Sequence, residues 1–211
     1  MDSHGFRVYC AGPLFNERER AEMQLIAEAI FEAGYDTFLP QRDGLELTKC
    51  IEKLKQDGFA DDQASRLMCE AVFALDVYQV LEGCHLVVAN LNGRVPDEGT
   101  VSEAAIAWSR GKPVVGYKTD SRTAFGGQDN PLVAGLFDFE LCRSPREVAE
   151  QVARKLKSIG SFESHTDERE REIHSRVRLG EAIWDQLRGN QGIDGVVAVL
   201  AQHTSLAEKA G

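Results

Sequence analysis

Residues 85–117 read HLVVANLNGRVPDEGTVSEAAIAWSRGKPVVGY, and this stretch decides the fold class. Its first part, 85–90, is nearly all apolar, as expected of a strand that is buried on both faces. A second strand is predicted at 113–117, and a helix is predicted over 100–110 between the two. The order strand, helix, strand is typical of a parallel sheet that is covered by helices on both faces.

The same alternation continues outward along the chain. Three further strands are predicted, at 6–11, 35–39 and 137–141. Helices are predicted from Asn16 to Gly34, in pieces broken near Gly58 over 47–81, and at 145–157. This rhythm predicts an α/β fold with a doubly wound, five-stranded parallel sheet of the flavodoxin-like or Rossmann-like type. Ligands of such folds bind at the carboxyl ends of the strands, which here lead into loops 12–16, 40–45, 91–100 and 118–131.

The composition changes after Gly160. Residues 161–172 are polar and rich in charge, and apolar residues then return at helical spacing. We therefore expect one α/β domain over residues 1–160 and a helical C-terminal extension over 161–211.

The charge and the cysteines restrict the partners and the compartment. The 211 residues include 24 basic and 34 acidic side chains, a net charge of −10 that argues against a nucleic-acid polymer as a partner. The five cysteines are dispersed without a CxxC pair, which argues against a disulfide framework. Neither a signal-peptide pattern nor an apolar run of membrane-spanning length is present. The sequence thus predicts a cytoplasmic protein with no membrane partner.

Several common catalytic and cofactor motifs are missing from the sequence. There is no GxGxxG after the first predicted strand, no GxxxxGK[ST], no HExxH and no GxSxG. The five histidines are also scattered along the chain. We therefore expect neither a metal ion nor a cofactor.

Two carboxylates stand out after the central predicted strand: Asp97 in the loop and Glu103 in the first turn of the following helix. The spacing from Thr100 to Glu103 is that of a capping box, which is a purely structural interpretation. In the functional interpretation, the helix dipole keeps Glu103 ionised at neutral pH, and the two carboxylates act on either side of an anomeric carbon. The spacing permits both interpretations.

Five segments in order carry a resemblance to a known family. They are VYCAGPLF at 8–15, FLPQRDG at 38–44, VVANLNGRVPDEGTVSEAAIA at 87–107, GKPVVGYKTD at 111–120 and NPLVAG at 130–135. Together they resemble the nucleoside 2-deoxyribosyltransferase family over about residues 6–158, and the tail from Gly160 onward lies outside the match. The resemblance implies a flavodoxin-like enzyme that cleaves the N-glycosidic bond of 2′-deoxynucleosides, with these nucleosides and free nucleobases as its small-molecule partners.

The resemblance also implies roles for particular residues. Glu103 corresponds to the nucleophile, Asp97 to an aspartate that contacts the base and helps proton transfer, and Tyr9 to a tyrosine that orients the nucleophile. Asn130 corresponds to an asparagine that reaches into the site of a neighbouring subunit, which implies a homo-oligomer with shared sites. The implied substrate-binding residues are Gly12, Pro13, His85, Asn90, Gly99 and Asn130. Gly12 is expected to let the first loop approach the ligand closely.

One departure from the family and two other functions remain open at this point. The family often has an aspartate where this chain has His85, so that residue either contacts the base or is a core histidine bonded to the backbone. One alternative activity is a 2′-deoxynucleoside 5′-monophosphate N-glycosidase, which uses water as the acceptor. The other is a nucleotide-sensing module without catalysis.

Overall fold

The computed structural model describes residues 5–123 and 129–158, together with isolated positions between residues 175 and 199. The chain divides into two compact units, Met1–Gly160 and Ser161–Gly211. The described positions of the second unit are helical except at Gly189. Its assignment as a helical extension of a catalytic domain stays a prediction. None of the described helices is long and apolar enough to cross a membrane.

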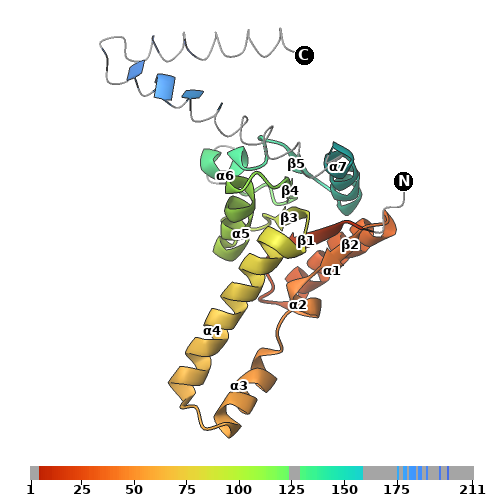
Figure 1. The fold of residues 1–211 in the computed structure, drawn as a ribbon. Helices are drawn as coiled ribbons and strands as arrows, with labels where there is room; N and C mark the ends of the chain where they lie inside the picture. The colour runs from red at the N-terminus through yellow and green to blue at the C-terminus, as the bar shows by residue number, and fades with distance from the viewer. Residues whose placement is uncertain are drawn as a thin grey trace. The chain divides into compact units, whose positions relative to one another are not determined.

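The first unit is built on one parallel sheet of five strands (Figure 1). The strands are β1 Arg7–Ala11, β2 Asp36–Phe38, β3 Leu86–Asn90, β4 Val114–Tyr117 and β5 Leu141–Cys142. Their order is β2-β1-β3-β4-β5, and all four neighbouring pairs run parallel. This is the flavodoxin-like order, so the predicted doubly wound α/β fold is confirmed.

Helices cover both faces of this sheet. They are α1 Glu17–Glu32, α2 Pro40–Asp43, α3 Leu47–Gln56, α4 Asp61–Tyr78, the π-helical turn η1 Gln79–Gly83, α5 Glu98–Ser109, α6 Pro131–Gly135 and α7 Pro145–Ser158. Asn16 caps α1 as predicted, because its side chain accepts a hydrogen bond from the Glu19 N–H at 3.0 Å. Gly34 follows the end of α1 with φ +93°, a conformation that favours glycine.

The two faces of the sheet have separate apolar cores. In β1, Val8 and Cys10 pack with α1 and α7, whereas Tyr9 and Ala11 pack with α5 and η1. This division follows from the period of two along a strand. The alternation directs the Tyr9 side chain toward α5.

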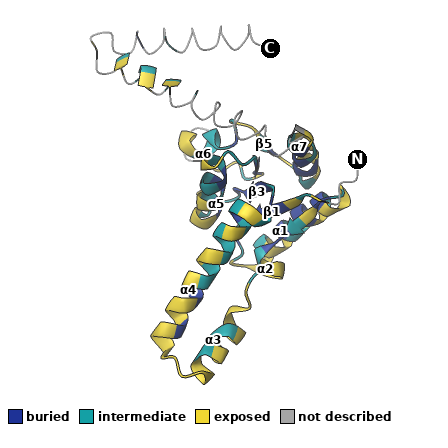
Figure 2. Ribbon diagram, viewed as in Figure 1, coloured by how far each residue is buried: buried dark blue, intermediate teal, exposed yellow. Residues whose placement is uncertain are grey.

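Helices α3 and α4 form an antiparallel pair that is exposed over most of its surface (Figure 2). Over the 18 residues of α4, only Ala64 and Met68 are buried. The predicted break lies at Gly58, whose φ of +94° again favours glycine. The C-terminal end of α4 nevertheless lies at the candidate active site.

The strand predicted at 137–141 is wrong over most of its length. Residues Asp138 and Phe139 have φ of 55° and 62°, which belongs to a left-handed turn and not to a strand. This turn directly follows α6, and β5 begins only at Leu141. The alternating apolar pattern of FDFEL therefore arises from a turn that packs Phe137 into the core.

Candidate active site

Tyr9 and Glu103 meet in the structure although they lie 94 residues apart in the sequence. The Tyr9 hydroxyl donates a hydrogen bond of 2.6 Å to Oε1 of Glu103. The Tyr9 ring is fully buried and is stacked on Phe38, with ring centroids 5.5 Å apart. The orientation of the Glu103 carboxylate is thus fixed by a side chain of β1.

Asp97 is the N-cap of α5, and this corrects the expected capping box. Its Oδ2 accepts hydrogen bonds from both the backbone N–H and the hydroxyl of Thr100, each at 2.8 Å. The helix consequently begins at Glu98 and not at Thr100, which moves Glu103 from the first to the second turn. The Glu103 carboxylate accepts the bond from Tyr9 instead of folding back as part of a cap.

A cavity of about 410 Å³ lies beside these groups at the carboxyl end of β1. Its walls are mostly apolar, with Leu14, Phe15, Val72 and Leu75 among the lining residues. Three carboxylates line the cavity: Asp76, Asp97 and Glu103. The cavity therefore combines mostly apolar walls, which suit a flat ring, with three carboxylates, and this combination is suited to a small polar ligand.

Burial sets the protonation of Glu103. It raises the pKa of this carboxyl to about 7; the hydrogen bond from Tyr9 lowers the pKa, and the charges of Asp76 and Asp97 raise it further. With this pKa, Glu103 is only partly ionised at neutral pH, whereas the helix dipole was expected to keep it ionised. In the second turn the carboxylate lies beyond the strongest part of the dipole, and desolvation dominates.

Asp76 is a candidate functional residue that sequence reasoning missed. It lies on α4, and burial raises the pKa of its carboxyl, whereas its interaction with the Tyr9 hydroxyl lowers that pKa. Val72, Leu75 and Asp76 stand at positions i, i+3 and i+4 and therefore share one helix face. An acidic residue within the apolar face of an amphipathic helix was the available signal.

The two glycines implied in substrate binding both line the cavity, but for different reasons. A Cβ atom at Gly12 would lie 2.1 Å from Sδ of Met23, so a larger residue there would require the Met23 side chain to move. A Cβ atom at Gly99 would meet only Oδ2 of Asp97, at 3.2 Å. Gly12 thus packs closely on α1, and its close approach to a ligand stays a prediction.

The structure does not bring His85 to the cavity. It precedes β3 at the amino end of the sheet, where its Nδ1 accepts a hydrogen bond of 3.1 Å from the Arg7 N–H. Its ring meets Phe6 edge-on at 5.0 Å. Burial lowers the pKa of His85. This is the arrangement of a histidine bonded to the backbone, the alternative to base contact.

Asn90 and Pro13 also lie away from the cavity. Asn90 is fully buried on the α1 face of the sheet, where its Nδ2 donates to Oε2 of Glu22 at 3.0 Å. Its Oδ1 accepts from the Asn92 N–H at 3.0 Å. Pro13 lines a second, more polar cavity of about 520 Å³ on the other side of the β1–α1 loop. Neither side chain is among those that line the acidic cavity, and the substrate contact of both residues stays a prediction.

Asn130 is exposed at the start of α6 and accepts a hydrogen bond of 2.9 Å from the Leu132 N–H. This is an ordinary N-cap. The contact of Asn130 with a neighbouring subunit stays a prediction.

The described residues contain no cluster of three or more His, Cys, Asp or Glu side chains arranged to hold a metal ion. The acidic cavity itself combines one oriented carboxylate with two others and the Tyr9 hydroxyl. Carboxylates in such an arrangement stabilise positive charge that develops on a bound sugar ring and supply a nucleophile and a proton donor.

Comparison with known proteins agrees with this chemistry. The model of a family described as "Nucleoside 2-deoxyribosyltransferase" matches residues 8–173. This match extends to residue 173, whereas the resemblance seen in the sequence was expected to end before Gly160. No curated protein matches the chain.

Solved structures resemble the fold. A conserved protein from Enterococcus faecalis V583 has 23% identity and a TM-score of 0.54, over 71% of this chain and 98% of that chain. A 2-deoxyribosyltransferase from Bacillus psychrosaccharolyticus has 15% identity and a TM-score of 0.48, over 68% and 90%. A 2-desoxiribosyltransferase from Leishmania mexicana has 16% identity and a TM-score of 0.37, over 61% and 85%.

Proposed function

Because this chain belongs to the nucleoside 2-deoxyribosyltransferase family, we propose that it moves a 2-deoxyribosyl group between nucleobases through an ester on Glu103. The observation that carries the proposal is the bond of 2.6 Å from Tyr9 to Glu103 in a cavity lined by two further carboxylates. Tyr9 holds one oxygen of Glu103, which leaves the other oxygen for attack on the sugar.

In the first step, the free oxygen of Glu103 attacks C1′ of a 2′-deoxynucleoside. The electron pair of the C1′–N bond leaves with the base, which takes a proton from Asp97 or Asp76. The positive charge that develops on the sugar is stabilised by the carboxylates around it. A second base then attacks C1′ from the side that the first base left, and it gives its N–H proton to the carboxylate that protonated the first base. Glu103 departs as a carboxylate, and the configuration at C1′ is retained.

Product analysis by chromatography tests this function. We expect a new deoxynucleoside when the protein is incubated with one 2′-deoxynucleoside and a different free base, and little product when the second base is omitted. The control is the Glu103→Ala protein in the same mixtures. Free base and 2-deoxyribose 5-phosphate from a monophosphate, without exchange, would identify the hydrolase. Binding without any bond cleavage would identify a nucleotide-sensing module.

The pH dependence of kcat/KM offers a second test, because this ratio reports the pKa of the free enzyme. The pKa of Glu103 is about 7, and only the ionised carboxylate attacks. We therefore expect kcat/KM to fall as the pH decreases through about 7.

The Asp76→Asn variant sharpens this test. It removes a negative charge that raises the pKa of Glu103. The fall of kcat/KM at acidic pH, the acid limb of the profile, should therefore move to lower pH even if the maximal rate falls. The matched control is Asp62→Asn on the exposed face of the same helix, which should leave the limb in place. An acid limb that does not move in Asp76→Asn would contradict the assigned electrostatics.

A further inference from the structure

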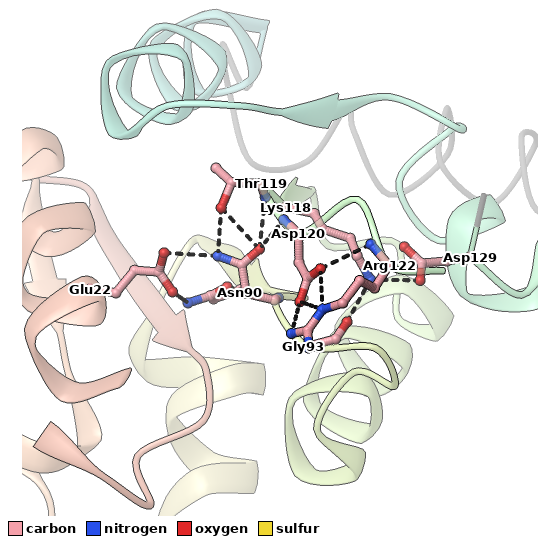
Figure 3. A network of polar contacts seen from close by, with 9 residues as sticks. Glu22, Asn90, Gly93, Lys118, Thr119, Asp120, Arg122 and Asp129 are labelled. Carbon is pink, nitrogen blue, oxygen red and sulfur yellow. Dashed lines mark hydrogen bonds and ion pairs between the residues drawn. The ribbon is translucent and has the colours of Figure 1, made fainter. Parts of the chain in front are cut away.

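A buried ion pair lies just beyond β4, outside the acidic cavity (Figure 3). Nζ of Lys118 is 2.7 Å from Oδ1 of Asp129, and the two side chains are only 1% and 4% exposed. Nζ also donates a hydrogen bond of 3.1 Å to the carbonyl oxygen of Gly93. Burying a charged ammonium group away from water costs free energy unless the group is paired and hydrogen-bonded. The partners of Lys118 must therefore be held in place.

The partners of Lys118 belong to two segments that are far apart in the sequence. Gly93 lies in the loop from β3 to α5, four residues before Asp97, and its φ is +119°. Asp129 directly precedes Asn130 and α6. One ammonium group thus fixes the loop that ends on Asp97 against the segment that opens α6.

The neighbouring residue Asn92 fastens the same loop from its other side. Its Oδ1 accepts hydrogen bonds from the N–H groups of Thr119 and Asp120, at 2.7 and 2.9 Å. Its Nδ2 donates to Oε1 of Glu22 at 2.8 Å. Figure 3 labels Glu22 of α1, Gly93 of the β3–α5 loop, and Thr119 and Asp120 after β4, which all lie in this polar network. The start of the loop is therefore tied by hydrogen bonds to α1 and to the segment after β4.

We propose that Lys118 is a positioning residue for this enzyme: it holds the β3–α5 loop so that Asp97 faces the departing base. The inference rests on the proposed function, because Asp97 acts as a proton donor only in that reaction. Asp97 caps α5 through Thr100 while its other carboxylate oxygen remains for the ligand. In this proposal, a shift of the loop at Gly93 changes the placement of this oxygen.

Stability alone does not account for such a pair. Replacing both members of a buried ion pair by apolar residues of similar volume is often neutral or stabilising. What an apolar replacement cannot supply is the donor to the Gly93 carbonyl oxygen. The distinction between stability and positioning makes the inference testable.

The experiment compares Lys118→Met with the charge-free double variant Lys118→Met/Asp129→Leu, each with and without Asp97→Asn. Asparagine caps helices as well as aspartate does, so Asp97→Asn keeps α5 intact and removes only the acid. The matched control is Lys155→Met, which removes an ammonium group from the Val114 carbonyl oxygen at the opposite end of β4. The measurements are kcat, the melting temperature and hydrogen exchange of residues 91–99.

We expect the double variant to melt at or above the wild-type temperature and yet to lose about tenfold to a hundredfold in kcat, as for a misplaced catalytic group. In the Asp97→Asn background the same change should cost less than about twofold, because residues that act through one another are not additive. Hydrogen exchange of residues 91–99 should be faster in the double variant. Lys155→Met should leave kcat and this exchange unchanged.

Equal losses of kcat in both backgrounds, or a double variant with wild-type kcat, would overturn the inference. If the wild-type protein transfers no deoxyribosyl group, the proposed function fails instead. Hydrogen exchange then still decides whether Lys118 holds the loop, since exchange that does not change in the double variant contradicts the role without any turnover.

Discussion

Glu103→Gln is expected to lower the rate of deoxyribosyl transfer at least about 10⁴-fold, as removal of a catalytic nucleophile does in other enzymes. The glutamine side chain has nearly the same shape, and its carbonyl oxygen still accepts the hydrogen bond from Tyr9. It lacks the second carboxylate oxygen that forms the ester with C1′. The loss is therefore chemical and leaves the walls of the cavity in place.

The measurement is the rate of base exchange, with Glu98→Gln as the matched control. Glu98 is the first residue of the same helix, and it is exposed to solvent. Its substitution should leave the rate within about twofold of wild type, as for other surface changes. Intact-protein mass spectrometry should find a deoxyribosyl adduct on the wild-type chain and none on Glu103→Gln. Transfer that persists in Glu103→Gln would remove the covalent intermediate from the mechanism.

The same substitution is expected to stabilise the folded protein by about 3 kcal/mol at pH 8. The ordinary pKa of a glutamate carboxyl is 4.5, whereas burial raises the pKa of Glu103 to about 7 in the folded state. Between these two values the unfolded chain releases its proton and the folded chain retains it, so ionisation increasingly favours unfolding as the pH rises. A neutral glutamine avoids this penalty.

Denaturant unfolding at about pH 8 and about pH 4 measures the effect. The gain in the free energy of unfolding should be largest at the higher pH and should vanish below the ordinary pKa of the carboxyl. Glu98→Gln should show no comparable gain at either pH, because its side chain is in water in both states. A Glu103→Gln protein with wild-type stability at pH 8 would mean that Glu103 is ionised without cost in the folded state.

The fold was predictable because the apolar pattern of each element depends only on nearby residues. Short strands rich in apolar residues alternate with helices, and this rhythm permits few arrangements other than a parallel sheet. The turn at Asp138 and Phe139 escaped prediction because FDFEL alternates as a strand does. Local pattern alone did not distinguish a left-handed turn from an extended strand.

The site was less predictable because its parts come from distant segments. Tyr9 and Glu103 meet only through the pairing of β1 with β3 and the packing of α5 on that face. Asp97 and Thr100 are both competent caps, so the sequence did not decide where α5 begins. Asp76 was overlooked because its helix has a regular apolar face that packing alone explains. Only in the folded chain does that face lie near Glu103.

Tyr9, which orients the candidate nucleophile, lies in a part of the fold that is expected to open most rarely. Its strand, β1, is paired on both sides, with β2 and with β3, and its ring is fully buried between the sheet and α5. Residues in such positions lose their native contacts only when the whole domain unfolds, whereas loops open far more often. Local fluctuations that admit and release a ligand are therefore expected to change the walls and the mouth of the cavity, while the Glu103 carboxylate keeps its direction.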